Sequence, residues 1–315
     1  MRIVFLGTPE FGVTVLKALL ESRHEIIGVI TRPDAPSGRG KQLVAPPVKQ
    51  FAKEQKLKVF QFEKLSRDGV ETIQKLNPDL MVTASFGQII SKEILDIPPY
   101  GILNVHASIL PKFRGASPIQ TAIMKGETVT GVTIMKTELG LDTGDIYSIK
   151  TTPINPYETA GELSKRLADI GAKLLLETID DIEYKGLQPQ PQSHVQATIT
   201  KKITKEDVRI RWVKSDNEIK NLIYGANPSP IAYTETEDGT LVKIYEAKLT
   251  NLPNTQEPEG TIVAPTSNKK GVFVQCGQGV LQLTKLQFAG GKEMDGASAI
   301  NGNKLKLGQK FVSAY

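Results

Sequence analysis

The sequence predicts an α/β protein in which a doubly wound, mostly parallel sheet is followed by a small β-barrel. First, strand-like apolar runs alternate with amphipathic helices up to about residue 180, which is typical of βαβ units. Second, a connector rich in proline and glutamine breaks this alternation, and short, closely spaced strands follow it. We therefore expect two domains, 1–189 and 206–315, joined by a linker over 190–205.

The N-terminal elements follow from apolar runs and helical spacing. The first two strands are expected at "RIVFLG" and "EIIGVIT", with a helix at "EFGVTVLKALLES" between them. Further strands are expected at "KVFQF", "PDLMVTASF", "GILNVHA", "GVTIMKT" and "DIYSIKTTPI", and a long amphipathic helix at "TAGELSKRLADIGAKLLLETIDDI". Runs that are apolar throughout are typical of parallel strands covered on both faces.

The C-terminal segment has a different pattern. One helical stretch, "DNEIKNLIYGA", precedes short strands separated by turn signals, among them Asp238-Gly239 between two alternating runs. About five such strands are enough for a small barrel of the oligonucleotide-binding (OB) type. We expect an OB-like barrel here.

Composition indicates a soluble, cytoplasmic protein. The hydrophobic share of 39% and the charged share of 23% are those of a globular chain. No apolar run reaches the roughly 18–20 residues of a membrane span. Pro9 and Glu10 interrupt the short N-terminal apolar run, which therefore does not resemble a signal peptide. The single cysteine, Cys276, cannot form an internal disulfide, which fits a reducing compartment.

Nucleotide-binding and metal-binding patterns are absent from the sequence. The first strand–helix turn, "GTPEFG", lacks both the G-x-G-x-x-G spacing and a Gly-Lys-Ser/Thr sequence. One cysteine and three scattered histidines offer no ligand cluster, so we expect no metal.

Two polar residues stand at the end of the strand "GILNVHA". Asn104 and His106 are two residues apart, so both can point to one face of the sheet. Ligands of doubly wound sheets bind beyond this end of the strands. An amide and an imidazole directed at one spot can stabilise an oxyanion or transfer a proton, although a histidine near a strand end is more often structural.

A candidate carboxylate follows the next strand, in "GLDTGDI". Glycines 140 and 144 bracket Asp142 and give the backbone freedom to present its carboxylate, which can orient an imidazole. Asp145 competes for this role, but it leads into a strand and fits a turn better. An Asn, a His and an Asp without a Ser or Cys nucleophile indicate direct group transfer.

The two stretches together resemble the 10-formyltetrahydrofolate-dependent formyltransferases. "NVHASILPKFRGASPIQ" and "GVTIMKTELGLDTGDI" match that family's Asn-x-His, Ser-Leu-Leu-Pro-x-x-Arg-Gly and Leu-Asp-x-Gly-Asp pattern. The departures are Ile109 in place of the usual Leu, and Ala107, where Gly or Ser is also common. The resemblance implies a Rossmann-like core and 10-formyltetrahydrofolate as formyl donor and co-substrate.

The resemblance also implies roles for individual residues. Asn104 and His106 would bind the formyl oxygen as it becomes an oxyanion, and Asp142 would orient His106 or take the amine proton through a water. The folate would be held by four consecutive residues: Ser108, Ile109, Leu110 and Pro111. The slot for the pterin ring would include Phe86, Gly87 and Ile89.

Two further features bear on the acceptor amine. The insertion over 31–49 is basic, and it resembles the loop with which one enzyme of this family reaches a tRNA acceptor stem; we expect Arg39 and Lys41 to contact tRNA. The net charge is +5, and most of the basic excess lies in 201–315, which resembles that enzyme's tRNA-binding domain. The expected acceptor is initiator methionyl-tRNA, with no membrane and no protein partner.

Three alternatives stay open. A glycinamide ribonucleotide formyltransferase shares the core but leaves the second domain and the basic loop unexplained. A sugar-nucleotide N-formyltransferase keeps the same three residues and can carry a barrel, but the "GRGK" loop argues against it. A non-catalytic RNA-binding protein on an inactive core is opposed by the complete set of Asn104, His106 and Asp142.

Overall fold

The computed structural model describes residues 1–37, 42–264 and 271–312. The chain forms two compact units. The first comprises Met1–Pro118, Val129–Pro153 and Ser164–Lys201, and the second comprises Ile119–Thr128, Ile154–Leu163 and Lys202–Tyr315. Two short segments of the N-terminal half thus group with the barrel, and the predicted domain bounds stay a prediction.

The first unit is built on a seven-stranded sheet in the order β10-β9-β7-β6-β1-β2-β5. The strands are β1 (Arg2–Gly7), β2 (Glu25–Thr31), β5 (Val59–Gln61), β6 (Leu80–Ala84), β7 (Ile102–His106), β9 (Val129–Lys136) and β10 (Ile146–Pro153). From β5 to β7 all neighbours are parallel, whereas β9 and β10 run antiparallel at the edge. The predicted doubly wound, mostly parallel sheet is confirmed.

The strand order places a ligand-binding crevice. From β1 the chain first proceeds outward through β2 and β5, and it then returns to add β6 and β7 on the other side of β1. In open sheets of this kind, ligands bind beyond the carboxyl ends of the strands next to this reversal. The carboxyl ends of β6 and β7 therefore belong to the crevice.

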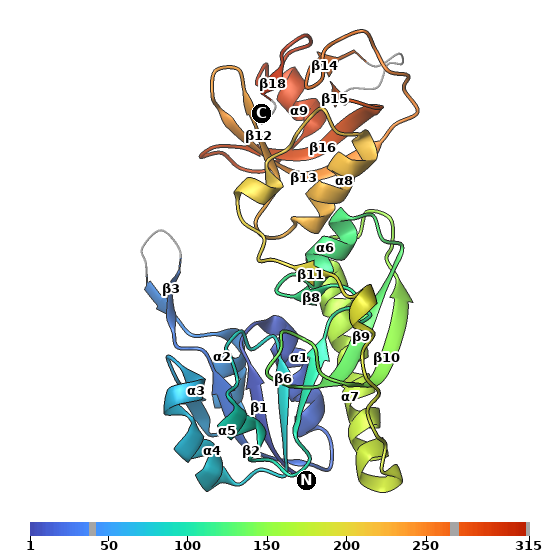
Figure 1. Cartoon of the computed structure of the whole chain (residues 1–315). Helices are drawn as coiled ribbons and strands as arrows, with labels where there is room; N and C mark the ends of the chain where they lie inside the picture. Colours follow the sequence, from blue (N-terminus) through green and yellow to red (C-terminus); the bar gives the residue numbers. More distant parts are fainter. Residues whose placement is uncertain (38–41, 265–270, 313–315) are drawn as a thin grey trace. The chain divides into compact units, whose positions relative to one another are not determined.

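Helices pack around this sheet because their apolar residues recur at helical spacing. In α1 (Glu10–Leu20) the buried positions include Phe11, Val15 and Leu19, four residues apart. The other helices of this unit are α2 (Pro47–Glu54), α3 (Leu65–Asp68), α4 (Val70–Leu76) and α5 (Lys92–Leu95), whereas α6 (Pro118–Met124) falls almost wholly in the second unit and α7 (Ala160–Lys185) falls mostly in the first. Their positions are labelled in Figure 1.

The basic insertion after β2 carries a short two-stranded ribbon. Strands β3 (Ala35–Ser37) and β4 (Gln42–Val44) pair antiparallel, with Ala35 opposite Val44. Arg39 and Lys41, the predicted tRNA contacts, lie outside the described residues.

The second unit contains an antiparallel barrel. Its strands are β12 (Tyr233–Thr236), β13 (Leu241–Leu249), β14 (Ile262–Val263), β15 (Val272–Gln275), β16 (Val280–Phe288), β17 (Met294–Asp295) and β18 (Phe311–Val312), in the order β14-β15-β16-β13-β12-β18 with β17 on β16. A bridge between Thr261 and Lys310 joins the two ends of this order. The sheet is thereby nearly closed, which confirms the predicted barrel (Figure 1).

The barrel is filled around a tryptophan. The fully buried Trp212 stacks on Phe311, with ring centroids 5.6 Å apart, and its Nε1 donates to Thr234 Oγ1 at 3.0 Å. Helix α8 (Asp216–Gly225) begins with a capping box formed by Ser215 and Glu218, and α9 (Gly296–Asn301) follows β17. Among the described residues, no helix is both long enough and apolar enough to cross a membrane.

Candidate active site

The candidate site lies at the carboxyl end of β7. His106 is the last residue of the strand and is 6% exposed, and Asn104 lies two residues earlier on the same face. Thr83, opposite Asn104 on β6, donates from its hydroxyl to Asn104 Oδ1 at 2.8 Å. Because the carbonyl end of the amide is thus engaged, the donor end, Nδ2, faces the site.

Asp142 reaches the same place from the loop between β9 and β10. Its Oδ1 lies 3.4 Å from Asn104 Nδ2, and its Oδ2 lies 3.6 Å from His106 Nδ1. The backbone of Asp142 is left-handed, with φ of +50°, a conformation that aspartate tolerates better than most residues. The structure therefore brings together the three residues that the sequence predicts as catalytic.

The loop after β7 fixes the carboxylate through Gly115. The Gly115 amide donates to Asp142 Oδ2 at 2.7 Å. A Cβ at this position would lie 2.3 Å from the Thr200 carbonyl oxygen, and φ is +104°. Only glycine fits, which explains why the sequence has Arg-Gly here.

The imidazole of His106 is held by a hydrogen bond on one side and faces a carboxylate on the other. Its Nε2 lies 3.0 Å from the Phe113 carbonyl oxygen, which only accepts, so Nε2 carries a proton. Its Nδ1 faces the Asp142 carboxylate, close to the donor end of Asn104. The arrangement places the Asn104 amide donor, the His106 ring and a carboxylate around one spot.

The four predicted folate residues form the loop that follows His106. Ser108 is fully buried, and its hydroxyl donates to the Lys112 carbonyl at 2.7 Å. The Thr133 hydroxyl donates to the Ser108 carbonyl and accepts from the Leu110 amide, at 2.7 and 3.2 Å. Leu110 is also buried, whereas Ile109 and Pro111 are half-buried. Two of the four side chains thus point into the protein.

The predicted pterin slot lies in the loop after β6. Phe86 is buried in the core, and its carbonyl accepts from the Thr8 hydroxyl at 3.0 Å. Gly87 is exposed with φ of +76°, and Ile89 is 80% exposed. The side chain of Gln88 braces the loop by donating to the Phe62 carbonyl and accepting from the Leu65 amide, both at 2.8 Å.

A pocket of about 400 Å³ adjoins the loop that carries Asp142. Residues from α5, from the start of β7 and from 136–140 line it, among them Leu95, Ile102 and Leu139. The predicted folate residues do not line this pocket.

Sequence reasoning missed two residues that hold the site. Thr83 lies in an apolar strand, and nothing in the sequence pattern indicated a role for its hydroxyl. Gln192 lies in the segment predicted as a linker, yet it is buried and contacts the Asp142 loop. Strand β11 (Ile199–Thr200), in the same segment, pairs with β8 (Arg114–Gly115). The proline- and glutamine-rich composition gave no indication of these contacts.

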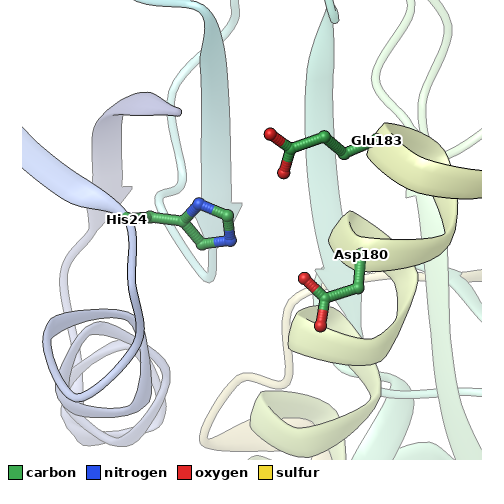
Figure 2. A group of neighbouring side chains, drawn as sticks. All are labelled: His24, Asp180 and Glu183. Carbon is green, nitrogen blue, oxygen red and sulfur yellow. The ribbon is translucent and has the colours of Figure 1, made fainter.

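A second polar group resembles a metal site but has another explanation. Figure 2 shows Asp180 and Glu183 projecting from α7 toward His24, and their ligand-type atoms lie within 4.8 Å of one another. The Arg23 guanidinium donates to both carboxylates, and these bonds raise its pKa. Burial, followed by the N-terminal ammonium, lowers the pKa of His24. Because Arg23 already pairs with both carboxylates, we assign no ion here.

Comparison with known proteins identifies the class of this fold and site. Residues 1–179 match the family described as formyl transferase, and residues 202–304 match its C-terminal domain. The chain belongs to this formyl transferase family. A methionyl-tRNA formyltransferase from Acetivibrio thermocellus is 43% identical over 310 residues, which are 98% of this chain and 99% of the relative. Within the family, the chain therefore belongs with the methionyl-tRNA formyltransferases.

Solved structures agree in fold. A methionyl-tRNA formyltransferase from Clostridium thermocellum aligns over 80% of this chain and 94% of its own, with 20% identity and a TM-score of 0.54. An N-formyltransferase from Helicobacter canadensis, in complex with folinic acid and dTDP-3-aminofucose, aligns over 90% and 98%, with 20% identity and a TM-score of 0.64. The predictions of the family, of a transferase and of the two-part fold are confirmed.

Proposed function

We propose that the chain transfers the formyl group of 10-formyltetrahydrofolate to the free amine of initiator methionyl-tRNA, giving N-formylmethionyl-tRNA. The observation that carries this proposal is the meeting of Asn104, His106 and Asp142 at the carboxyl end of β7, in a chain with full-length relatives of that activity.

The geometry suggests how these residues act. The folate supplies an activated formyl group, and negative charge develops on the formyl oxygen as the methionine amine attacks the formyl carbon. Asn104 Nδ2 and the His106 imidazole would stabilise the charge on that oxygen, and such stabilisation is commonly the largest contribution to acyl transfer. Asp142 would keep the imidazole oriented and accept the proton that the amine loses, through a water. The bond to the folate nitrogen then breaks, and that nitrogen takes up the proton that the amine lost to Asp142.

The loops after β6 and β7 have surfaces that suit a folate bound at the crevice. Because the Ser108 and Leu110 side chains are buried, their loop would contact the folate through its main chain and through Ile109 and Pro111. Gly87 and Ile89 present exposed surface in the loop after β6, which suits the pterin side. Phe86 would support that loop from the core.

The acceptor, initiator methionyl-tRNA, is proposed from the similarity of nearly the whole chain to a relative. The full-length identity to a methionyl-tRNA formyltransferase covers the insertion over 31–49 and the barrel together. Within the insertion, Lys49 is already paired with Asp34 at 2.7 Å, and this bond lowers the pKa of the carboxyl. Arg39 and Lys41, which lie outside the described residues, are kept as the proposed phosphate contacts, with 206–315 as the proposed tRNA-binding domain and 1–189 as the catalytic domain.

A direct assay tests the proposal. The chain is incubated with 10-formyltetrahydrofolate and either charged initiator tRNA or a sugar nucleotide that carries a free amine. We expect formyl transfer to the tRNA alone, and its loss in His106→Ala. Transfer to the sugar amine with none to tRNA would assign the chain to the sugar-modifying branch, and no transfer to either would leave the RNA-binding alternative.

A further inference from the structure

The side-chain amide of Gln192 is fully engaged next to the catalytic loop. Its Nε2 donates to the carbonyl oxygens of Asp142 and Gly144, at 2.9 and 2.6 Å. Its Oε1 accepts from Arg114 Nε and Nη2, at 3.1 and 2.8 Å. Only the nitrogen end of the amide can face two carbonyls, so the orientation of this side chain is determined by its surroundings.

Arg114 completes the support. It is 6% exposed, and its guanidinium also lies 3.5 Å from His194 Nδ1. The next residue, Gly115, donates its amide to the Asp142 carboxylate. Asp142 is therefore held at two points. Gln192, itself bonded to Arg114, holds its main-chain carbonyl, and Gly115 holds its carboxylate.

The position of Asp142 is sensitive to this support. Its backbone is left-handed, which is not the preferred conformation of an aspartate, so neighbouring contacts must maintain it. Its Oδ2 is 3.6 Å from His106 Nδ1, longer than a formed hydrogen bond. A shift of a few tenths of an ångström decides whether the carboxylate reaches the imidazole.

We propose that Gln192, held by Arg114, is a positioning residue that sets the Asp142 carboxylate against His106 during formyl transfer. The proposal rests on the catalytic role proposed above for Asp142. It gives the segment between the two predicted domains a part in the reaction.

Two substitutions separate positioning from folding. Gln192→Met has a similar length and removes all four hydrogen bonds. Gln192→Glu keeps an acceptor for Arg114 and adds a favourable charge pair, but it replaces the donor to the two carbonyls by a carboxylate that repels them. Gln190→Met is the matched control. Gln190 is exposed, and within the described part of the chain its hydrogen bonds are main-chain bonds to Ile146.

The measurements are the single-turnover rate of formyl transfer, the KM for the folate and the melting temperature, in the full chain and in an Asp142→Asn background. We expect both Gln192 variants to lower the rate on the order of 10- to 100-fold, as small misplacements do. The KM of both variants and the melting temperature of Gln192→Glu should stay near those of the parent chain. In the Asp142→Asn background the effect of Gln192→Glu should disappear, since both changes act through one carboxylate.

Other results overturn the inference in distinguishable ways. A parental rate in Gln192→Glu, or an equal rate loss in both backgrounds, removes the positioning role while the proposed function stands. If Gln192→Met fails to fold, the transfer rate of Gln192→Glu alone tests the inference. If Asp142→Asn itself is fully active, the proposed role of Asp142 fails and the inference fails with it.

Discussion

The hydroxyl of Thr83 on β6 donates to Asn104 Oδ1 on β7 at 2.8 Å, and this bond holds the amide whose Nδ2 lies 3.4 Å from the Asp142 carboxylate. A hydroxyl can accept as well as donate, so the acceptor-only carboxylate of Asp142 fixes which end of the amide faces the site, and the Thr83 bond keeps that amide in place. One buried hydroxyl in a neighbouring strand thereby helps to position the Asn104 amide in the candidate oxyanion site.

Thr83→Val should therefore lower the rate of formyl transfer. The substitution keeps the shape and removes one hydrogen bond worth about 1 kcal/mol, so we expect a fall of about five- to tenfold in kcat. Thr31→Val is the control, because Thr31 is equally buried on β2 and its hydroxyl has no hydrogen-bond partner in the described structure. Steady-state kinetics of both variants decide the matter; equal rates in the two would contradict the role of Thr83.

Asn104→Ala and His106→Ala should each cost on the order of 10²–10³ in rate, the usual loss when an oxyanion donor is removed. Because both side chains face the same place, the double variant should lose less than the product of the two single effects. Folate affinity, measured by titration, should largely persist. Strictly multiplicative losses would show that the two residues act on different atoms.

Asp142→Asn should lower the transfer rate by at least about 100-fold, because it removes the carboxylate that faces the His106 imidazole. Asp145→Asn should remain close to the parent, since Asp145 accepts from the Lys136 amide through its main-chain carbonyl, which the substitution keeps. Rates and melting temperatures of the two variants test the assignment. An inactive Asp145→Asn beside an active Asp142→Asn would reverse it.

Use of tRNA should depend strongly on salt. Contacts to phosphates release counterions, so the KM for charged tRNA should rise steeply between low and moderate salt while the KM for the folate changes less. Arg39→Ala and Lys41→Ala should raise the tRNA KM and flatten this dependence. A tRNA KM that is insensitive to salt and to both substitutions would favour a small acceptor.

The capping box of α8 should contribute a pH-dependent part of the stability of the barrel unit. The pKa of Glu218 is lowered to about 2, first by Lys214 and then by the amide and hydroxyl of Ser215. A lowered folded-state pKa means that this contribution is present above the ordinary value of 4.5 and is lost as the pH falls from there toward 2. Ser215→Ala should cost about 1 kcal/mol in the free energy of unfolding.

Urea unfolding of Glu218→Gln at several pH values checks this contribution. The substitution should lower stability at neutral pH and weaken its decline in acid. The size is limited because Lys214 and Glu218 are about half exposed. An unchanged pH dependence would mean that the cap contributes nothing measurable.

Much of the fold and of the candidate site can be predicted from local sequence patterns. The strands of the first unit are apolar runs that end in polar residues, and the parallel arrangement brings those ends together, so Asn104 and His106 could be placed before the fold was known. Asp142 followed because glycines flank it. Among the four predicted folate residues after His106, the side chains of Ser108 and Leu110 proved to be buried, and the hydrogen bonds inside their loop cannot be inferred from residue type.

The supporting contacts could not be predicted because they join residues far apart in the chain. Gln192 meets Arg114 and Asp142 across separations of 78 and 50 residues. The local sequence pattern of a glutamine among prolines is the same whether its side chain is exposed or buried. The antiparallel course of β9 and β10 was equally hidden, since an edge pair can have the same apolar pattern as a parallel pair.

The stacked pair of Trp212 and Phe311 has a practical consequence for following unfolding. Trp212 is the only tryptophan of the chain, and it is fully buried in the barrel unit. Its fluorescence therefore reports the opening of the barrel alone, and the sheet that carries Asn104, His106 and Asp142 is spectroscopically silent at that wavelength. A tryptophan introduced into the first unit would be needed to time the loss of the site against the loss of the barrel.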